Sequence, residues 1–96
     1  MPAVTRIGDA DVAHCSGMTR AVGSGDVFVN GIGVSRQDDV NTSHLLPPAP
    51  CPSHSAPIAV GSTTVFTNGK GTGRVGDAIS GCTSVAAGSP NVFAGG

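Results

Sequence analysis

Three histidines and three cysteines are the side chains of this 96-residue chain best suited to bind a transition-metal ion. Three of them, His14, His44 and Cys82, share one spacing, because each lies eight residues after an arginine that is followed by an aspartate three residues on. The arginine–aspartate pairs are Arg6 and Asp9, Arg36 and Asp39, and Arg74 and Asp77. This recurring spacing predicts three equivalent positions in a repeated unit, with three metal-binding side chains converging on one axis.

A fourth ligand is expected from the linker that follows His44. The chain runs 17 residues from His44 to Gly61, whereas the matching stretch from His14 to Gly23 runs 9. The longer linker contains "LPPAPCPSH", which ends in His54. A closed site of three imidazoles and one thiolate suits a structural zinc ion, with ferrous iron as the alternative. The expected ligands are His14, His44, His54 and Cys82.

The two remaining cysteines are interpreted differently. Cys51 lies three residues before His54, and this C-x-x-H spacing makes Cys51 a rival to His54 or a further ligand. Cys15, next to His14, is expected to be a small packed residue. An odd number of cysteines cannot all pair within the chain, which favours a reduced compartment during synthesis.

The elements that must position these ligands are repeated hairpins. The stretch "VGSGDVFVNGIGVSRQDD" (22–39) aligns without gaps on "VGSTTVFTNGKGTGRVGD" (60–77), and "AGSPNVF" (87–93) begins a third copy. The missing half of that copy is "PAVTR" (2–6) at the start of the chain, so the repeat is circular. Asn-Gly at 30–31 and 68–69 favours two-residue type I′ turns, and no stretch has sustained helical periodicity. In the split unit, Gly95 and Gly96 take the place of Asn-Gly.

The expected fold is all-β: a small cone of three pseudo-threefold β-hairpin repeats, circularly closed, with a metal site at the apex. Residues 1–96 are expected to form one domain. Alternation along a strand puts two matched sets of apolar residues on opposite faces, and we expect the phenylalanine set to line the shared core. The two sets are Val27, Val65 and Val92, and Phe28, Phe66 and Phe93.

Charge and composition exclude several classes of partner. Five basic residues against six acidic ones, with no basic run, argue against nucleic acid or anionic lipid. The start of the chain, "MPAVTRIGDA", has no apolar segment typical of a secretory signal, so synthesis in the cytoplasm without a signal peptide is expected.

The repeat resembles the PAAR-repeat proteins, which form the tips of spikes in contractile injection machines. The family's pattern looks like GS-x-x-VF-x-NG followed by R-x-GD, and it stands here as "GSGDVFVNGIGVSRQDD", "GSTTVFTNGKGTGRVGD" and "GSPNVF" joined to "AVTRIGD". The Pro-Ala-Ala-Arg tetrapeptide itself is not present, because its places read "AVTR", "GVSR" and "GTGR" and keep the arginine alone.

The resemblance implies a structural protein, not an enzyme. Its wide base would bind the blunt end of a trimeric β-helical spike, one copy per spike trimer, and its apex would hold zinc through three histidines and one cysteine. The target implied by the resemblance would be the cell envelope that is pierced on injection. We expect this chain to carry no effector extension, which favours a bacteriophage tail, with the protein in the virion, over secretion on a type VI spike.

Two other functions are weighed against this interpretation. A small metallohydrolase could use the same histidine and cysteine cluster, with Asp9, Asp39 or Asp77 as general base. Their placement opposite three arginines fits structural ion pairs or turn caps better. A free zinc-binding regulator is the second alternative, and it would release its metal reversibly.

Overall fold

The fold is all-β over the part of the chain that the computed structural model describes. This part comprises residues 2–13, 17–42, 44–45, 53–80 and 83–95, with the backbone alone described at 44–45 and 53–54. These residues contain no helix, and their strands are two residues long. The strands are β1 (Phe28–Val29), β2 (Ile32–Gly33), β3 (His44–Leu45), β4 (Ser53–His54), β5 (Phe66–Thr67) and β6 (Lys70–Gly71). They pair antiparallel as β1–β2, β3–β4 and β5–β6.

The two hairpins predicted at Asn-Gly are confirmed. Asn30 and Gly31 have φ angles of 55° and 76°, and Asn68 and Gly69 have 55° and 78°, which are the left-handed values that a type I′ turn requires. The registers also match, because Phe28 lies opposite Gly33 and Phe66 lies opposite Gly71. The same local sequence therefore folds in the same way at two places in the chain.

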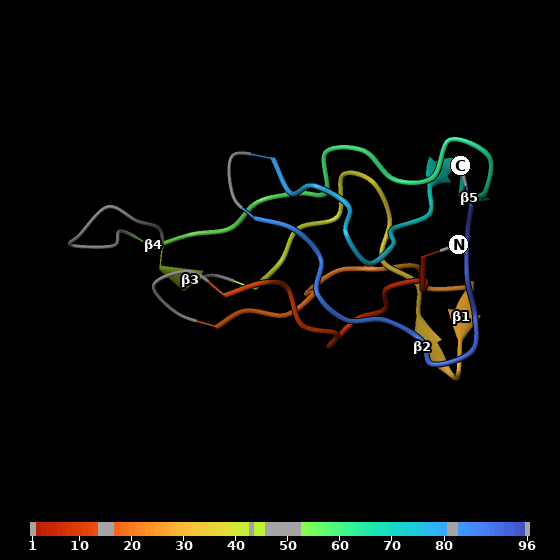
Figure 1. Cartoon of the computed structure of the whole chain (residues 1–96), viewed down its shortest axis with the longest axis horizontal. Coiled ribbons are helices and arrows are strands. Elements are labelled where there is room, and N and C mark those ends of the chain that lie inside the picture. The colour runs from red at the N-terminus through yellow and green to blue at the C-terminus, as the bar shows by residue number, and fades with distance from the viewer. Residues whose placement is uncertain (1, 14–16, 43, 46–52, 81–82, 96) are drawn as a thin grey trace.

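The two ends of the described chain pair with one another in the same register. Ala3 lies opposite Phe93 in an antiparallel bridge, at the place that Gly33 and Phe28 occupy in the first hairpin. Hydrogen bonds flank this bridge on both sides, from Val4 N to Val92 O at 3.0 Å and from Ala94 N to Pro2 O at 3.0 Å. Figure 1 accordingly shows the N and C ends at the same end of the molecule.

Three main-chain hydrogen bonds join the three arginine-bearing segments in a triangle. Thr5 N donates to Gly73 O at 3.0 Å, Gly73 N donates to Ser35 O at 2.9 Å, and Ser35 N donates to Thr5 O at 3.1 Å. Each of these residues directly precedes one of the three arginines. The approach is so close that a Cβ on Gly73 would lie 2.7 Å from Ser35 O.

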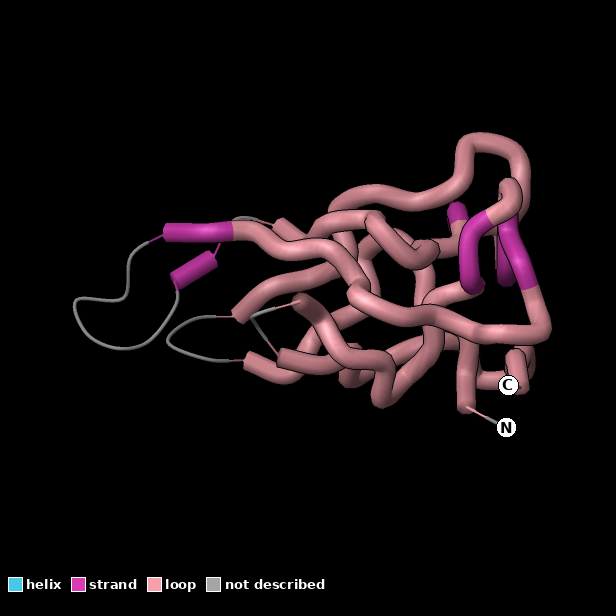
Figure 2. Tube along the Cα trace, turned by 90° about the horizontal axis from the view of Figure 1, so that it is seen from above, coloured by secondary structure: helices cyan, strands magenta, loops and turns pink. Residues whose placement is uncertain are grey.

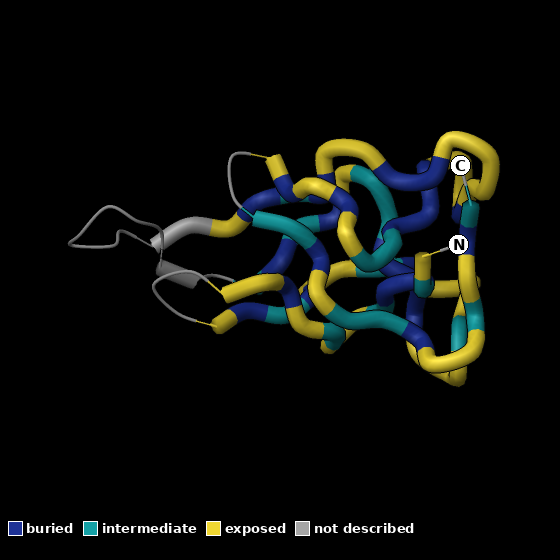
Figure 3. Tube along the Cα trace, viewed as in Figure 1, coloured by how far each residue is buried: buried dark blue, intermediate teal, exposed yellow. Residues whose placement is uncertain are grey.

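The core lies in two layers. One layer contains Val4, Val34 and Ala94, with Val29 and Val92 packed against it. The second contains Ala56, Ile58, Ile79 and Val85, with Val75 against it. Figure 3 shows buried segments through the middle of the molecule, while the hairpin turns are exposed.

The expectation that the phenylalanines line the core is wrong. Phe28, Phe66 and Phe93 are 57%, 60% and 49% exposed. Because side chains alternate along a strand, it is the residue after each phenylalanine that faces inward. These residues are Val29, which packs against the first layer, Thr67, which is buried, and Ala94, which belongs to that layer.

The second hairpin uses a polar pair at its inward positions. Thr67 and Thr72 stand where the first hairpin has Val29 and Val34, and both threonines are buried. Their hydroxyls are 2.8 Å apart and hydrogen-bonded to each other. Because each hydroxyl has the other as its hydrogen-bond partner, this hairpin can bury two hydroxyls without leaving either unpaired.

The hairpins and the β3–β4 pair lie at opposite ends of the molecule. The principal extents are 38 × 23 × 21 Å, and Figures 1 and 2 show β3–β4 at one end of the long axis, with the other strands at the far end. Over the described residues, we find no helix with the length and apolar character needed to cross a bilayer.

Candidate functional site

Each predicted arginine–aspartate pair forms a closed turn. In all three, the aspartate accepts hydrogen bonds from the backbone N, Nε and an Nη of the arginine three residues earlier. The ion-pair distances are 2.9 Å for Arg6–Asp9, 2.7 Å for Arg36–Asp39 and 2.8 Å for Arg74–Asp77. The residue before each aspartate has a positive φ, at Gly8 (90°), Asp38 (75°) and Gly76 (92°). The expectation of repeated structural ion pairs is confirmed.

Asp9 and Asp39 also stabilise the charge of the arginines that they hold. Hydrogen bonding to Asp9, opposed by partial desolvation, raises the pKa of Arg6, and Asp39 raises the pKa of Arg36 in the same way. Both oxygens of each carboxylate are engaged by an arginine, so the aspartates act as turn caps.

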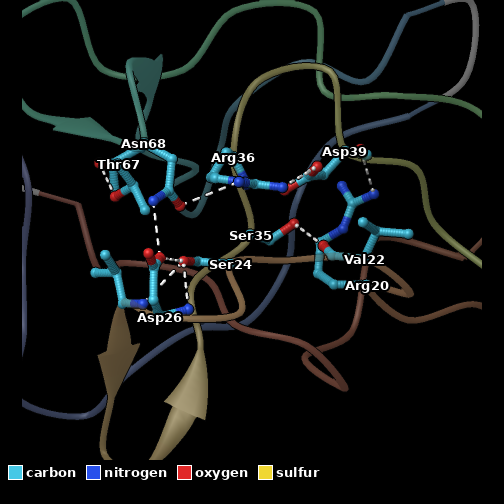
Figure 4. A network of polar contacts seen from close by, with 11 residues as sticks. Arg20, Val22, Ser24, Asp26, Ser35, Arg36, Asp39, Thr67 and Asn68 are labelled. Atoms are coloured by element: carbon cyan, nitrogen blue, oxygen red, sulfur yellow. Dashed lines mark hydrogen bonds and ion pairs between the residues drawn. The ribbon is translucent and has the colours of Figure 1, made fainter.

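The same arginines fasten each unit to its neighbour. Arg6 Nη1 donates to Asn30 Oδ1 and Arg36 Nη1 donates to Asn68 Oδ1, both at 3.1 Å, while Arg74 Nη1 donates to Gly95 O at 3.0 Å. Asn30 and Asn68 stand at the first turn position of a hairpin, and Gly95 stands at the matching place in the split unit. Figure 4 shows one of these links, from Arg36 to Asn68, and continues it to Asp26 through the 2.8 Å bond from Asn68 Nδ2.

Of the four expected metal ligands, two are placed by the backbone. His44 in β3 lies directly opposite His54 in β4, in an antiparallel pair. The β3–β4 pair, called the β3–β4 arm below, therefore holds two candidate ligands at matched positions. His14 and Cys82, and likewise Cys15 and the rival Cys51, lie outside the described residues. Among the residues that are described, no three His, Cys, Asp or Glu side chains gather as metal ligands.

A buried polar cluster between the core and this arm was not predicted from the sequence. The side chains of Arg20 and Asp11 have 0% exposure, and Arg20 Nη1 lies 3.8 Å from Asp11 Oδ2. Arg20 Nη2 also donates to Asp39 O at 3.2 Å, a bond visible in Figure 4. Asn41, itself buried, donates from Nδ2 to Asp11 Oδ2 at 3.2 Å.

Asn41 fastens the base of the β3–β4 arm. Its Oδ1 accepts from Ala56 N at 2.9 Å, and its own N donates to Ala56 O at 3.1 Å. Asn41 comes three residues before His44, and Ala56 comes two residues after His54. The segment that leads into β3 and the segment that follows β4 are therefore hydrogen-bonded to each other close to the two histidines.

The repeat contained a signal for this cluster. Gly8 N, Asp38 N and Gly76 N donate to the carbonyls of Arg20, Ile58 and Val85, so these three residues occupy matched places. Two of the three are aliphatic and buried, and the third is an arginine. A charged residue at a position that is apolar in the other units indicates a buried counter-charge, which here is Asp11.

The comparisons with known proteins identify the family. The family model described as PAAR motif matches residues 49–96, half of the chain. The chain belongs to the PAAR-motif family, as the resemblance of its repeats indicated. Proteins with this motif sit on the spikes of contractile injection machines. A search of curated proteins found no match to this chain.

Proposed function

We propose that this protein is the metal-binding tip of a contractile injection spike, a circularly closed cone that caps one trimeric β-helical spike protein. The observation that carries the proposal is the triangle of main-chain bonds among Thr5, Ser35 and Gly73, in which each residue donates to one partner and accepts from the other. Such a cycle is what a pseudo-threefold axis through a single chain would produce. The three matched arginine–aspartate turns and the pairing of the chain ends support the same arrangement.

Pseudo-threefold symmetry suits a cap for a trimer. A chain with three similar faces can contact three identical subunits at once, so one copy would close one spike. Mixing the protein with a trimeric β-helical spike fragment should therefore give one copy per three spike chains by light scattering. A complex with three copies per spike trimer would contradict this stoichiometry.

The apex is proposed to hold zinc through His14, His44, His54 and Cys82, with ferrous iron as the alternative. Imidazole and thiolate are the donors that zinc prefers, and four protein donors leave no open position for catalysis. The register of β3–β4 supports part of this set, because directly opposite positions of an antiparallel pair are the closest cross-strand neighbours. The metal would join the arm to the other two units and stabilise the point of the cone.

Elemental analysis tests the apex. The wild type is expected to contain about one zinc or iron ion per chain, and Cys82→Ser and His54→Ala should lose most of it. Cys51→Ser is the matched control and should retain the metal. Loss of metal in Cys51→Ser, with retention in His54→Ala, would transfer the fourth ligand to Cys51. A folded wild type without metal would refute the proposed apex.

We propose a structural role and not a catalytic one. A metallohydrolase would need a carboxylate ready to accept a proton, but the carboxylates of Asp9, Asp39 and Asp77 are each held by an arginine. A free zinc regulator would give up its metal readily, whereas a tip should keep it through prolonged chelation. Immunogold labelling of intact virions would identify a phage tail as the host machine, and contraction-dependent secretion would identify a type VI system.

A further inference from the structure

Among the described residues, three strand edges in matched positions at the hairpin end of the molecule have no main-chain hydrogen bond to a further strand. They belong to β1, β5 and the segment around Phe93. Figure 1 shows β1, β5 and the C-terminal segment at the end of the long axis farthest from β3–β4, with β1 farther out than β2. The edges thus lie at one end of the molecule.

The alternation of hydrogen bonds along each strand pair shows which main-chain groups face outward. In an antiparallel pair, hydrogen-bonded and non-hydrogen-bonded residue pairs alternate along the ladder. Val34 N donates to Val27 O at 3.1 Å and Val4 N donates to Val92 O at 3.0 Å, so the next pairs along, Phe28–Gly33 and Phe93–Ala3, are of the non-hydrogen-bonded kind. The N–H and C=O of each phenylalanine therefore point away from its partner strand.

The second hairpin follows the same rule. Thr72 N donates to Val65 O at 3.0 Å, which makes Phe66–Gly71 the non-hydrogen-bonded pair. Each of the three edges also carries an exposed phenylalanine, at Phe28, Phe66 and Phe93. A strand edge with unpaired main-chain groups and an apolar side chain is a template for the addition of another strand. Proteins normally protect such edges.

We propose that these three edges are the docking surface for the spike, and that each pairs by main-chain hydrogen bonds with a terminal strand of one spike subunit. This inference rests on the proposed function and deepens it, because it names the mode of contact. Three matched edges at one end fit a partner that offers three identical strands, and β-addition supplies affinity through backbone groups at Phe28, Phe66 and Phe93. The exposed aromatic rings would then pack beside the added strands.

Amide hydrogen exchange by NMR tests the proposal on the full chain, alone and with the trimeric β-helical spike fragment. In the free protein, the amides of Phe28, Phe66 and Phe93 should exchange rapidly, and in the complex all three should become protected by at least about tenfold. The amides of Ser35 and Gly73, bonded in the triangle, are internal controls and should be protected in both states.

A pair of variants separates the backbone from the side chain. Phe28→Pro removes both the ring and the outward N–H, whereas Phe28→Ala removes only the ring. Neither variant removes a hydrogen bond within the hairpin, because the N–H of residue 28 points outward, and proline is tolerated on edge strands. Phe28→Pro should bind the spike fragment at least about fivefold more weakly than Phe28→Ala.

The outcomes distinguish this inference from the proposed function. A stable complex in which the three amides stay unprotected, or in which both variants bind alike, would overturn strand addition and leave the spike-tip role in place. Failure of the wild type to bind any trimeric spike fragment would overturn both. Protection of the same amides in the free protein, with a dimer by sedimentation, would assign the edges to a second copy of this chain.

Discussion

Replacing Arg20 by valine should destabilise the protein severely, although valine is what the matched position 85 contains. The change removes the Arg20 guanidinium from beside the Asp11 carboxylate, whose side chain has 0% exposure. Removing one partner of a buried ion pair costs about 3–5 kcal/mol. Domains of this size have a total stability of about 5–15 kcal/mol, so a large part of it would be lost. The midpoint of thermal unfolding should fall by more than about 10 °C.

The unit that contains Arg74 and Asp77 supplies the matched control. It has Ile79 at the place of Asp11 and Val85 at the place of Arg20, and both are buried. The double variant Asp11→Ile with Arg20→Val replaces the ion pair by this apolar pair, which is often neutral or stabilising. We expect it to lie within about 1 kcal/mol of the wild type, because Asn41 loses one acceptor but keeps its bond from Ala56 N.

Urea unfolding followed by far-UV circular dichroism measures these differences, since the chain has no Trp or Tyr for fluorescence. The metal content of every variant must be measured and matched, because bound metal adds to apparent stability. If Arg20→Val alone were as stable as the wild type, the interpretation of a charged, buried pair would be wrong. A double variant as unstable as the single one would show that the site cannot accept an apolar pair.

Two further changes test the close packing and the acid sensitivity of the fold. Gly73→Ala should cost at least about 1–3 kcal/mol in urea unfolding, because the new Cβ would lie 2.7 Å from Ser35 O, whereas Gly25→Ala, with open space around it, should be tolerated. Hydrogen bonds from Asn68 and Ser24 lower the pKa of Asp26 from its ordinary 3.8, so its contribution to stability is full above about pH 5 and is lost as the pH falls through the lowered pKa. The stability difference between the wild type and Asp26→Asn should therefore shrink between about pH 5 and pH 2, and a constant difference would contradict the assignment.

The features that the sequence predicted correctly depend on short-range contacts. A type I′ turn is decided by two adjacent residues, and Asn30–Gly31 adopts it because both tolerate positive φ. The pairing of Arg36 with Asp39 needs only three residues of chain. Because these contacts are local, repeating the sequence repeats the structure, and the repeat alone was enough to recognise the family.

The tertiary structure decided which face of each hairpin is buried. Alternation fixes that Phe28 and Val29 point to opposite sides, but only the packing of the hairpins on one another chooses the inner side, and it chose Val29. The ion pair of Arg20 with Asp11 likewise joins segments that come together only when the chain folds. Sequence by itself thus determined the repeated unit and its turns, whereas the choice of core face depended on contacts between units. The buried charges showed in the repeat only as an arginine at a position that is aliphatic in the other units.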